Sequence, residues 1–119
     1  MRSLIICVIF CSWCASAFGQ SSDSLIANYK LQLLNAKTDS QKLNCFTQLS
    51  WEYGVVDIDS ALMYANDELN LARRINSPYW ISMGYNDLSI VAIRRGNYNE
   101  AIPYLKESLR IRIQLKDSN

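Results

Sequence analysis

The feature that most constrains the fold is an internal repeat with a period of forty residues. The segment DIDSALMYANDEL, which begins at Asp57, is echoed in GNYNEAIPYLKESL, which begins at Gly96. The identical pairs at this offset are Ala61 with Ala101, Tyr64 with Tyr104, and Leu69 with Leu109. Upstream, at an offset of thirty-nine, Phe46, Leu49 and Ser50 match Tyr85, Leu88 and Ser89. A sustained period of this length is typical of a stack of helical repeats.

Helix-capping signals recur along the same stretch. Thr38 with Gln41 forms a capping box, Asp57 is a good N-cap, and Pro78 follows Ser77 at a first helical position. These signals predict helices over about residues 39–54, 57–75, from Pro78 to a stop at Gly96, and from Asn97 to about Lys116, after an earlier helix that begins at Ser22 or Asp23. Pro103 is awkward, because it must remove one backbone hydrogen bond or move the helix start toward Asn99.

The N-terminus has the pattern of a secretory signal peptide. Arg2 precedes an apolar run from Leu4 to Cys11, and the small-residue stretch ASAFG follows it. We expect cleavage after Gly19, with Ala17 as the alternative, and therefore a periplasmic or secreted protein. The apolar run is short for a membrane span, which takes about 20 residues. An uncleaved signal would nevertheless tether the protein to the membrane.

Together these signals predict an all-α fold. It is an antiparallel helix-pair solenoid fragment of about five helices after a signal peptide, because short loops force neighbouring helices to run antiparallel. The predicted divisions are a signal peptide (1–19), an N-terminal helix (20–37), a first repeat (38–77) and a second repeat (78–119).

The repeated residues resemble the tetratricopeptide repeat family in its long-period form, since forty exceeds the usual length of about 34 residues. The second repeat carries the motif residues Tyr85, Leu88, Ser89, Ala92, Gly96, Tyr98, Ala101 and Leu105, and the first keeps Phe46, Leu49, Ser50, Tyr53, Ala61 and Ala65. The stretch LSWEYGVVDIDSALMYA is also similar to the N-terminal repeat regions of bacterial sensor histidine kinases and regulators. That resemblance implies signal transduction by a longer parent chain.

The repeat pattern also predicts which side chains are buried. Small residues at helix contacts and the leucines beside them form the expected core: Ser50, Ser89, Ala61, Ala101, Leu49, Leu88, Leu69 and Leu109. The last helix has two apolar stripes, and we expect the one containing Ala101, Ile102, Leu105 and Leu109 to pack on its partner helix. The other stripe, Tyr104, Ile111 and Leu115, would then need a further repeat or a homodimer to cover it.

The family resemblance implies a binding groove on the first helix of each repeat. The matching positions are Thr47, Trp51, Met83, Asn86, Ile90, Ile93 and Arg94. Trp and Arg are frequent interface hot spots, although Trp51 could instead be packed between helices and Asn86 could be solvated. The mixed apolar and amide lining suits a peptide. It lacks the lysine and asparagine pattern that resembles a clamp for C-terminal carboxylates.

Composition argues against other function classes. The chain has no histidine and only four glycines, so histidine-based catalysis, histidine metal sites and a glycine-rich phosphate loop are not expected. Removing Arg2 from the 12 basic residues leaves 11 against 11 acidic ones, which offers no attraction to nucleic acid. Cys45, the only cysteine after cleavage, is most simply a small buried residue.

We therefore expect no enzyme, no cofactor, no metal and no small-molecule substrate. The predicted function is an exported module for protein–protein interaction, either the N-terminal part of a larger signalling protein or a small adaptor that binds a peptide in its concave groove. The alternative is a structural repeat protein that dimerises through its last helix.

Overall fold

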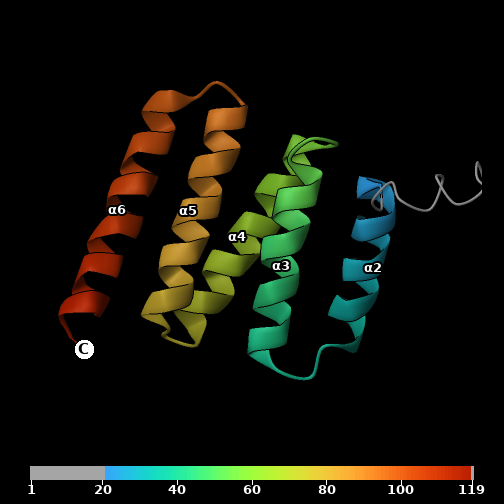
Figure 1. Cartoon of the computed structure of the whole chain (residues 1–119), viewed down its shortest axis with the longest axis horizontal. Coiled ribbons are helices and arrows are strands. Elements are labelled where there is room, and N and C mark those ends of the chain that lie inside the picture. The colour runs from blue at the N-terminus through green and yellow to red at the C-terminus, as the bar shows by residue number, and fades with distance from the viewer. Residues whose placement is uncertain (1–20, 119) are drawn as a thin grey trace, which may run out of the picture.

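The structure, a computed structural model, describes residues 21–118 of the chain. Figure 1 shows its helices lying side by side in chain order. They are α2 (Ser22–Asn35), α3 (Asp39–Tyr53), α4 (Ile58–Arg74), α5 (Pro78–Arg94) and α6 (Tyr98–Asp117). Residues 21–118 contain no strand. The predicted all-α fold of antiparallel helix pairs is confirmed, whereas the predicted signal peptide lies outside the described residues.

The helices begin where their capping residues stand. The Thr38 hydroxyl accepts a hydrogen bond from the backbone N–H of Gln41, whose side chain accepts one from the N–H of Thr38, as a capping box requires. Asp57 accepts from two backbone N–H groups at the start of α4. Asn97 precedes α6 as predicted, but its side chain accepts no capping hydrogen bond. Its amide nitrogen donates to the Glu100 carboxylate.

Two of the turns between helices contain a residue in the left-handed backbone conformation. Asn76 follows α4 with a φ of 54°, and Gly96 follows α5 with a φ of 79°. The N–H of the next residue in each case bonds back to a carbonyl of the last helical turn, Ser77 to Ala72 and Asn97 to Ala92. This is the Schellman arrangement, which ends a helix sharply and explains why the loops are short.

α6 accommodates a proline within its length. The helix begins at Tyr98 and continues through Pro103, which is exposed. The helix start has therefore not moved toward Asn99, and Pro103 removes one backbone hydrogen bond from the helix.

The stack curves toward α3 and α5. Each helix packs against its neighbour in the chain, and in addition α3 touches α5. Within residues 21–118, no Cα atom of α4 lies within 8 Å of a Cα atom of α6. The first helices of the two repeats are thus closer together than the second helices, which makes the side formed by α3 and α5 the concave one.

α4 is the central helix because it packs on both sides. One face, with Ile58, Leu62, Ala65 and Leu69, packs against Leu88 and Val91 of α5. The other face places Tyr64 beside Ile26 of α2 and Leu49 of α3, and Leu71 beside Leu43. Gly84 lets α5 approach α4 closely, since a Cβ there would lie 3.0 Å from the Cα atom of Leu69.

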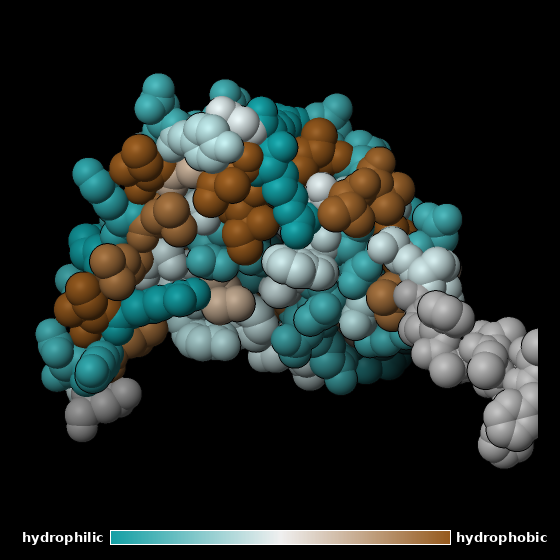
Figure 2. Space-filling model, turned by 45° about the horizontal axis from the view of Figure 1, so that its top comes forward, coloured by the Kyte–Doolittle hydropathy of each residue, from teal (hydrophilic) through white to brown (hydrophobic). Residues whose placement is uncertain are grey.

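The stripe that α6 leaves exposed is not the one predicted. Ile111 is only 7% exposed, and Tyr104 lies 6.1 Å from Tyr85 between ring centroids. Leu109, a predicted core residue, is 58% exposed. The apolar residues that face solvent along α6 are Tyr98, Ile102, Leu105, Leu109 and Ile113. Figure 2 shows hydrophobic residues among hydrophilic ones on the side of the molecule that α6 forms.

The reason for this correction is visible in the first repeat. Tyr64 of α4 packs toward the helices before it, whereas Leu69 packs toward α5 of the following repeat. The corresponding residues of α6 are Tyr104 and Leu109. α5 therefore covers Tyr104 and Ile111. The prediction that Tyr104, Ile111 and Leu115 form an exposed surface for a homodimer is wrong, because Ile111 is buried.

Candidate binding site

The concave side contains a hollow of about 290 Å³ between α3 and α5. Three predicted groove residues line it: Thr47 and Trp51 from α3, and Ile90 from α5. Its other lining residues are Gln48, Ser50, Asp87 and Val91. Apolar groups (Trp51, Ile90 and Val91) and polar groups therefore occur together in the lining, a combination that can hold a side chain with an apolar stem and a polar end.

Trp51 and Arg94 form the rim of this hollow. Trp51 is 55% exposed and so is not packed between helices. The Arg94 guanidinium lies 4.7 Å from the centre of the Trp51 ring, and its Nη1 donates a hydrogen bond to the Trp51 carbonyl oxygen at 3.2 Å. This cation–π contact across the groove links α5 to α3.

The remaining predicted residues lie elsewhere on α5. Met83 faces α6, where its sulfur lies 3.6 Å from Arg112 Nη2. Ile93 is 41% exposed and Asn86 is half-buried, and neither lines the hollow. The structure thus brings together Thr47, Trp51, Ile90 and Arg94, but not the full predicted set.

Sequence reasoning missed a pair of buried acids at this site. Glu68 of α4 is fully buried, and Asp87 of α5, which lines the hollow, is 9% exposed. The Thr47 hydroxyl donates a hydrogen bond to Glu68 Oε1 at 2.8 Å. Glu68 Oε2 and Asp87 Oδ2 are both buried and find no hydrogen-bond donor among the described residues. Buried carboxylate oxygens in this condition need a proton or a cation.

The electrostatics of the pair follow from its burial. The pKa of Glu68 is raised to about 9, mainly by burial and in addition by the charge of Asp87 and a hydrogen bond with Asp87. Burial also raises the pKa of Asp87. Burial therefore favours the protonated form of both carboxyls, and Glu68 holds its proton at neutral pH.

Helical periodicity contained a signal for Glu68. In α4, Ala61 and Ala65 are buried and so is Ala72, one position of the three- to four-residue period being left between Ala65 and Ala72; Glu68 fills it, on the same face. An acid on a core face needs a partner. No comparable signal distinguished Asp87 from the neighbouring Asn86, because both are polar residues in an otherwise apolar helix.

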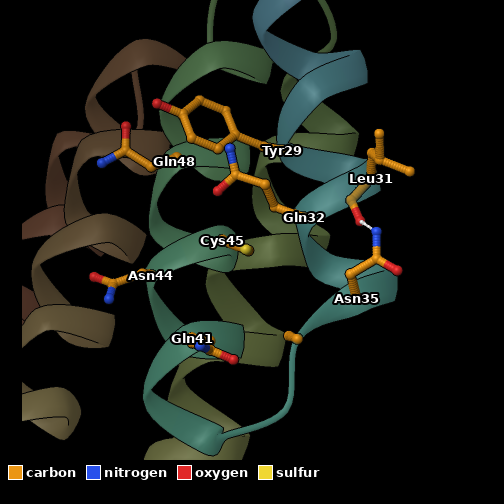
Figure 3. Close-up of a pocket in the computed structure, with 9 residues that line it drawn as sticks. Tyr29, Leu31, Gln32, Asn35, Gln41, Asn44, Cys45 and Gln48 are labelled. Carbon is orange, nitrogen blue, oxygen red and sulfur yellow. Dashed lines mark hydrogen bonds between the residues drawn. The ribbon is translucent and has the colours of Figure 1, made fainter.

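A second hollow, of about 440 Å³, lies between α2 and α3 (Figure 3). Its lining contains no charged side chain and is dominated by carboxamides: Gln32, Asn35, Gln41, Asn44 and Gln48. Two of these are already used, since Asn35 donates to the Leu31 carbonyl and Gln41 accepts from backbone N–H groups in the capping box.

Cys45 also lines this second hollow, and burial raises the pKa of its thiol. The thiol therefore stays protonated at neutral pH and is a poor nucleophile, as expected for a small buried residue.

Two further findings concern the described part of the chain. Within residues 21–118, no group of three or more histidine, cysteine, aspartate or glutamate side chains could hold a metal ion. None of the five helices is both long and apolar enough to cross a bilayer.

Comparison with known proteins gave one family. Residues 15–115 match the family model described as the SusR N-terminal TPR domain. Comparisons with curated proteins and with solved structures gave no match.

Proposed function

Because the chain belongs to the family of the SusR N-terminal TPR domain, we propose that it binds a peptide segment of another protein in the groove between α3 and α5. TPR domains are protein–protein interaction modules, and stacked helical repeats present extended concave surfaces for this purpose. We propose the groove between α3 and α5 as the binding surface and a peptide segment as its ligand.

The hollow between α3 and α5 is the observation that carries the proposal. It combines an exposed aromatic residue, Trp51, with aliphatic and hydroxyl groups from Ile90 and Thr47. Interface hot spots are enriched in tryptophan and arginine, and both types stand at its rim. A peptide lying along the groove would bury Trp51 and contact Arg94.

We further propose that the protein is exported and serves in signalling, as part of a longer chain or as an adaptor. Support for export is the signal-peptide pattern of residues 1–19. Support for signalling is the resemblance of the first repeat to the repeat regions of bacterial sensor proteins. A cleaved N-terminus beginning at Gln20, found by mass spectrometry of protein from the cell envelope or medium, would support export.

The groove is tested by selecting peptides from a random display library on the immobilised chain. The affinity of a selected peptide is then measured by fluorescence anisotropy for three proteins: the unmodified chain, Trp51→Ala and the control Tyr79→Ala. Tyr79 is a matched control, because it is 55% exposed like Trp51. It lies at the N-terminal end of α5, whereas Arg94 at the rim of the hollow lies at the C-terminal end.

We expect Trp51→Ala to weaken binding at least about tenfold, as for a hot-spot aromatic residue, and Tyr79→Ala to leave it unchanged. Selected peptides that bind both variants equally well, or a library that yields no binder, would overturn the groove as the binding surface.

A second candidate function is docking through α6, and the exposed stripe of that helix favours it. Tyr98, Ile102, Leu105 and Leu109 correspond to Ile58, Leu62, Ala65 and Leu69, which α5 covers in the first repeat. We propose that the occupant is a helix with the chemistry of α5, apolar and with a small residue facing Leu109, as Gly84 faces Leu69.

Appending a copy of residues 78–117 after Asp117 supplies such a helix. We expect the melting temperature to rise and Leu109→Asp to cancel the gain. The control is Lys106→Asp, an exposed residue outside the stripe. A chain that already sediments as a dimer, and that Leu109→Asp dissociates, would show that a second copy occupies the stripe and would overturn the proposal.

A further inference from the structure

The hollow between α3 and α5 is lined by an acid, Asp87, that forms no ion pair within residues 21–118. Charged groups approach it from three helices: Asp87 and Arg94 from α5, Glu68 from α4 and Arg112 from α6, while α3 contributes only uncharged lining residues. The ion pairs within residues 21–118 join Arg95 to Asp59 and Arg110 to Glu107, so neither involves these acids.

Both nearby arginines are engaged in other contacts. Arg94 lies over the Trp51 ring and donates to the Trp51 carbonyl. Arg112 directs its Nη2 to the Met83 sulfur, although its charge is close enough to favour ionisation of Asp87. Neither arginine therefore pairs with Asp87, which lines the hollow and is 9% exposed. Its buried Oδ2 finds no hydrogen-bond donor among the described residues apart from the Glu68 carboxyl in its protonated form.

We propose that this hollow holds the cationic side chain of a lysine or arginine of the bound peptide, with Asp87 as its anion. This inference rests on the proposed function, because it specifies what the peptide must carry. Ile90 and Val91 line one side, where the methylene stem of the side chain would pack. Arg94 above Trp51 is an intramolecular example of a guanidinium bound at the same rim.

Binding of a cation would be coupled to the protonation of this pair. Before binding, burial favours the protonated form of both carboxyls, and Glu68 holds a proton at neutral pH. An incoming ammonium or guanidinium group favours the state in which both are ionised, so the proton on Glu68 leaves to the solvent. Affinity for the cation should therefore rise with pH, up to about tenfold per pH unit if one proton is released.

The simplest probe is n-butylammonium chloride, which reproduces the end of a lysine side chain. We propose titrating it into the 15N-labelled full chain at constant ionic strength and following backbone amide shifts. The amides of Thr47, Asp87 and Ile90 should shift saturably with butylammonium. They should not shift with n-butanol, which has the same shape without charge, or with magnesium chloride.

Three variants sharpen the test. Asp87→Asn should weaken butylammonium binding at least tenfold, whereas Asp117→Asn, an exposed acid at the end of α6, should leave it unchanged. Glu68→Gln keeps Asp87 but removes the Glu68 proton, so its affinity should rise less steeply between pH 6 and 8 than that of the unmodified chain. A dispersed amide spectrum for each variant shows that it is folded.

Equal shifts with butanol or magnesium, or unchanged binding by Asp87→Asn, would overturn the inference. Selected peptides that need Trp51 but carry no lysine or arginine would also overturn it, while leaving the groove itself intact. Conversely, saturable butylammonium binding in a chain for which no peptide can be selected would support the acidic hollow and count only against the peptide function.

Discussion

α4 and α6 are each the second helix of a repeat, but among the described residues only α4 is followed by another helix. Both carry an apolar stripe at matching positions, with Leu69 in α4 and Leu109 in α6. Leu69 is 5% exposed because α5 covers it, whereas Leu109 is 58% exposed. The two leucines occupy the same position of the repeat, so their burial depends on which helix comes next.

This difference separates the local and the neighbour-dependent parts of the fold. In both repeats the second helix packs on the first helix of the same repeat, through Tyr64 in α4 and Tyr104 in α6. Its other stripe packs only when another helix lies beyond it. The stability that α4 gains from this second contact is available to α6 only from a further helix.

The largest expected effect comes from truncating the two leucines. Leu69→Ala should lower the free energy of unfolding by about 2–5 kcal/mol, because it opens a cavity between α4 and α5. Leu109→Ala should change it by less than about 0.5 kcal/mol, as for other surface substitutions. Urea unfolding followed by far-UV circular dichroism measures both. Similar losses for the two variants would mean that α6 is covered in solution.

The backbone of the two helices provides a second contrast. Pro103 of α6 stands where α4 has Met63, and both are exposed. Pro103→Ala restores a backbone donor and should raise the free energy of unfolding by about 1–3 kcal/mol. Met63→Ala should change it by only a few tenths. A loss of stability on Pro103→Ala, seen in the same urea experiment, would contradict this reading.

The close approach of α5 to α4 gives a third prediction. In Gly84→Ala the added Cβ would lie 3.0 Å from both Cα and Cβ of Leu69, and backbone cannot move aside as a flexible side chain can. We expect the free energy of unfolding to fall by about 1–2 kcal/mol. Thermal unfolding followed by circular dichroism measures this change. An unchanged melting temperature would show that the helices separate at little cost.

The comparison also shows what the sequence could predict. Helix starts and stops were predicted to within a few residues, because their signals are local. Thr38 and Asp57 cap through side-chain bonds to nearby backbone N–H groups, and Pro78 and Gly96 act through their own backbone geometry. Core positions that face a helix inside the repeat, such as Leu49 and Leu88, were also correct. The prediction that Leu109 is buried was wrong, because its burial requires a helix that follows α6. Local periodicity does not reveal which stripe that helix would cover.

The candidate site was predicted in part for a similar reason. Thr47, Trp51 and Ile90 lie on helix faces that the repeat pattern places toward the groove, and the hollow contains them. Glu68 and Asp87 come from different helices, and only the stacking of α4 on α5 brings their carboxyls together. Their contact is a tertiary property.

Glu68 and its equivalent in α6 provide the last and smallest contrast. The equivalent position, forty residues later, is Ser108, whose hydroxyl donates to the Ser82 carbonyl and does not titrate. The pKa of Glu68 is raised from 4.5 to about 9 in the folded chain. Between these values the folded state binds more protons than the unfolded state, so stability is greatest at low pH and falls as pH rises.

The absence of histidine from the chain leaves the range from pH 5 to 8 free for this test. We expect the free energy of unfolding to fall by about 1 kcal/mol per pH unit across it. Glu68→Gln should remove most of this slope and Ser108→Ala should keep it, as measured by urea unfolding at each pH. A flat profile for the unmodified chain would mean that Glu68 is ionised in the folded protein. The acid pair would then already hold a cation, and the most accessible candidate is Arg112, which would have to leave Met83 to reach Asp87.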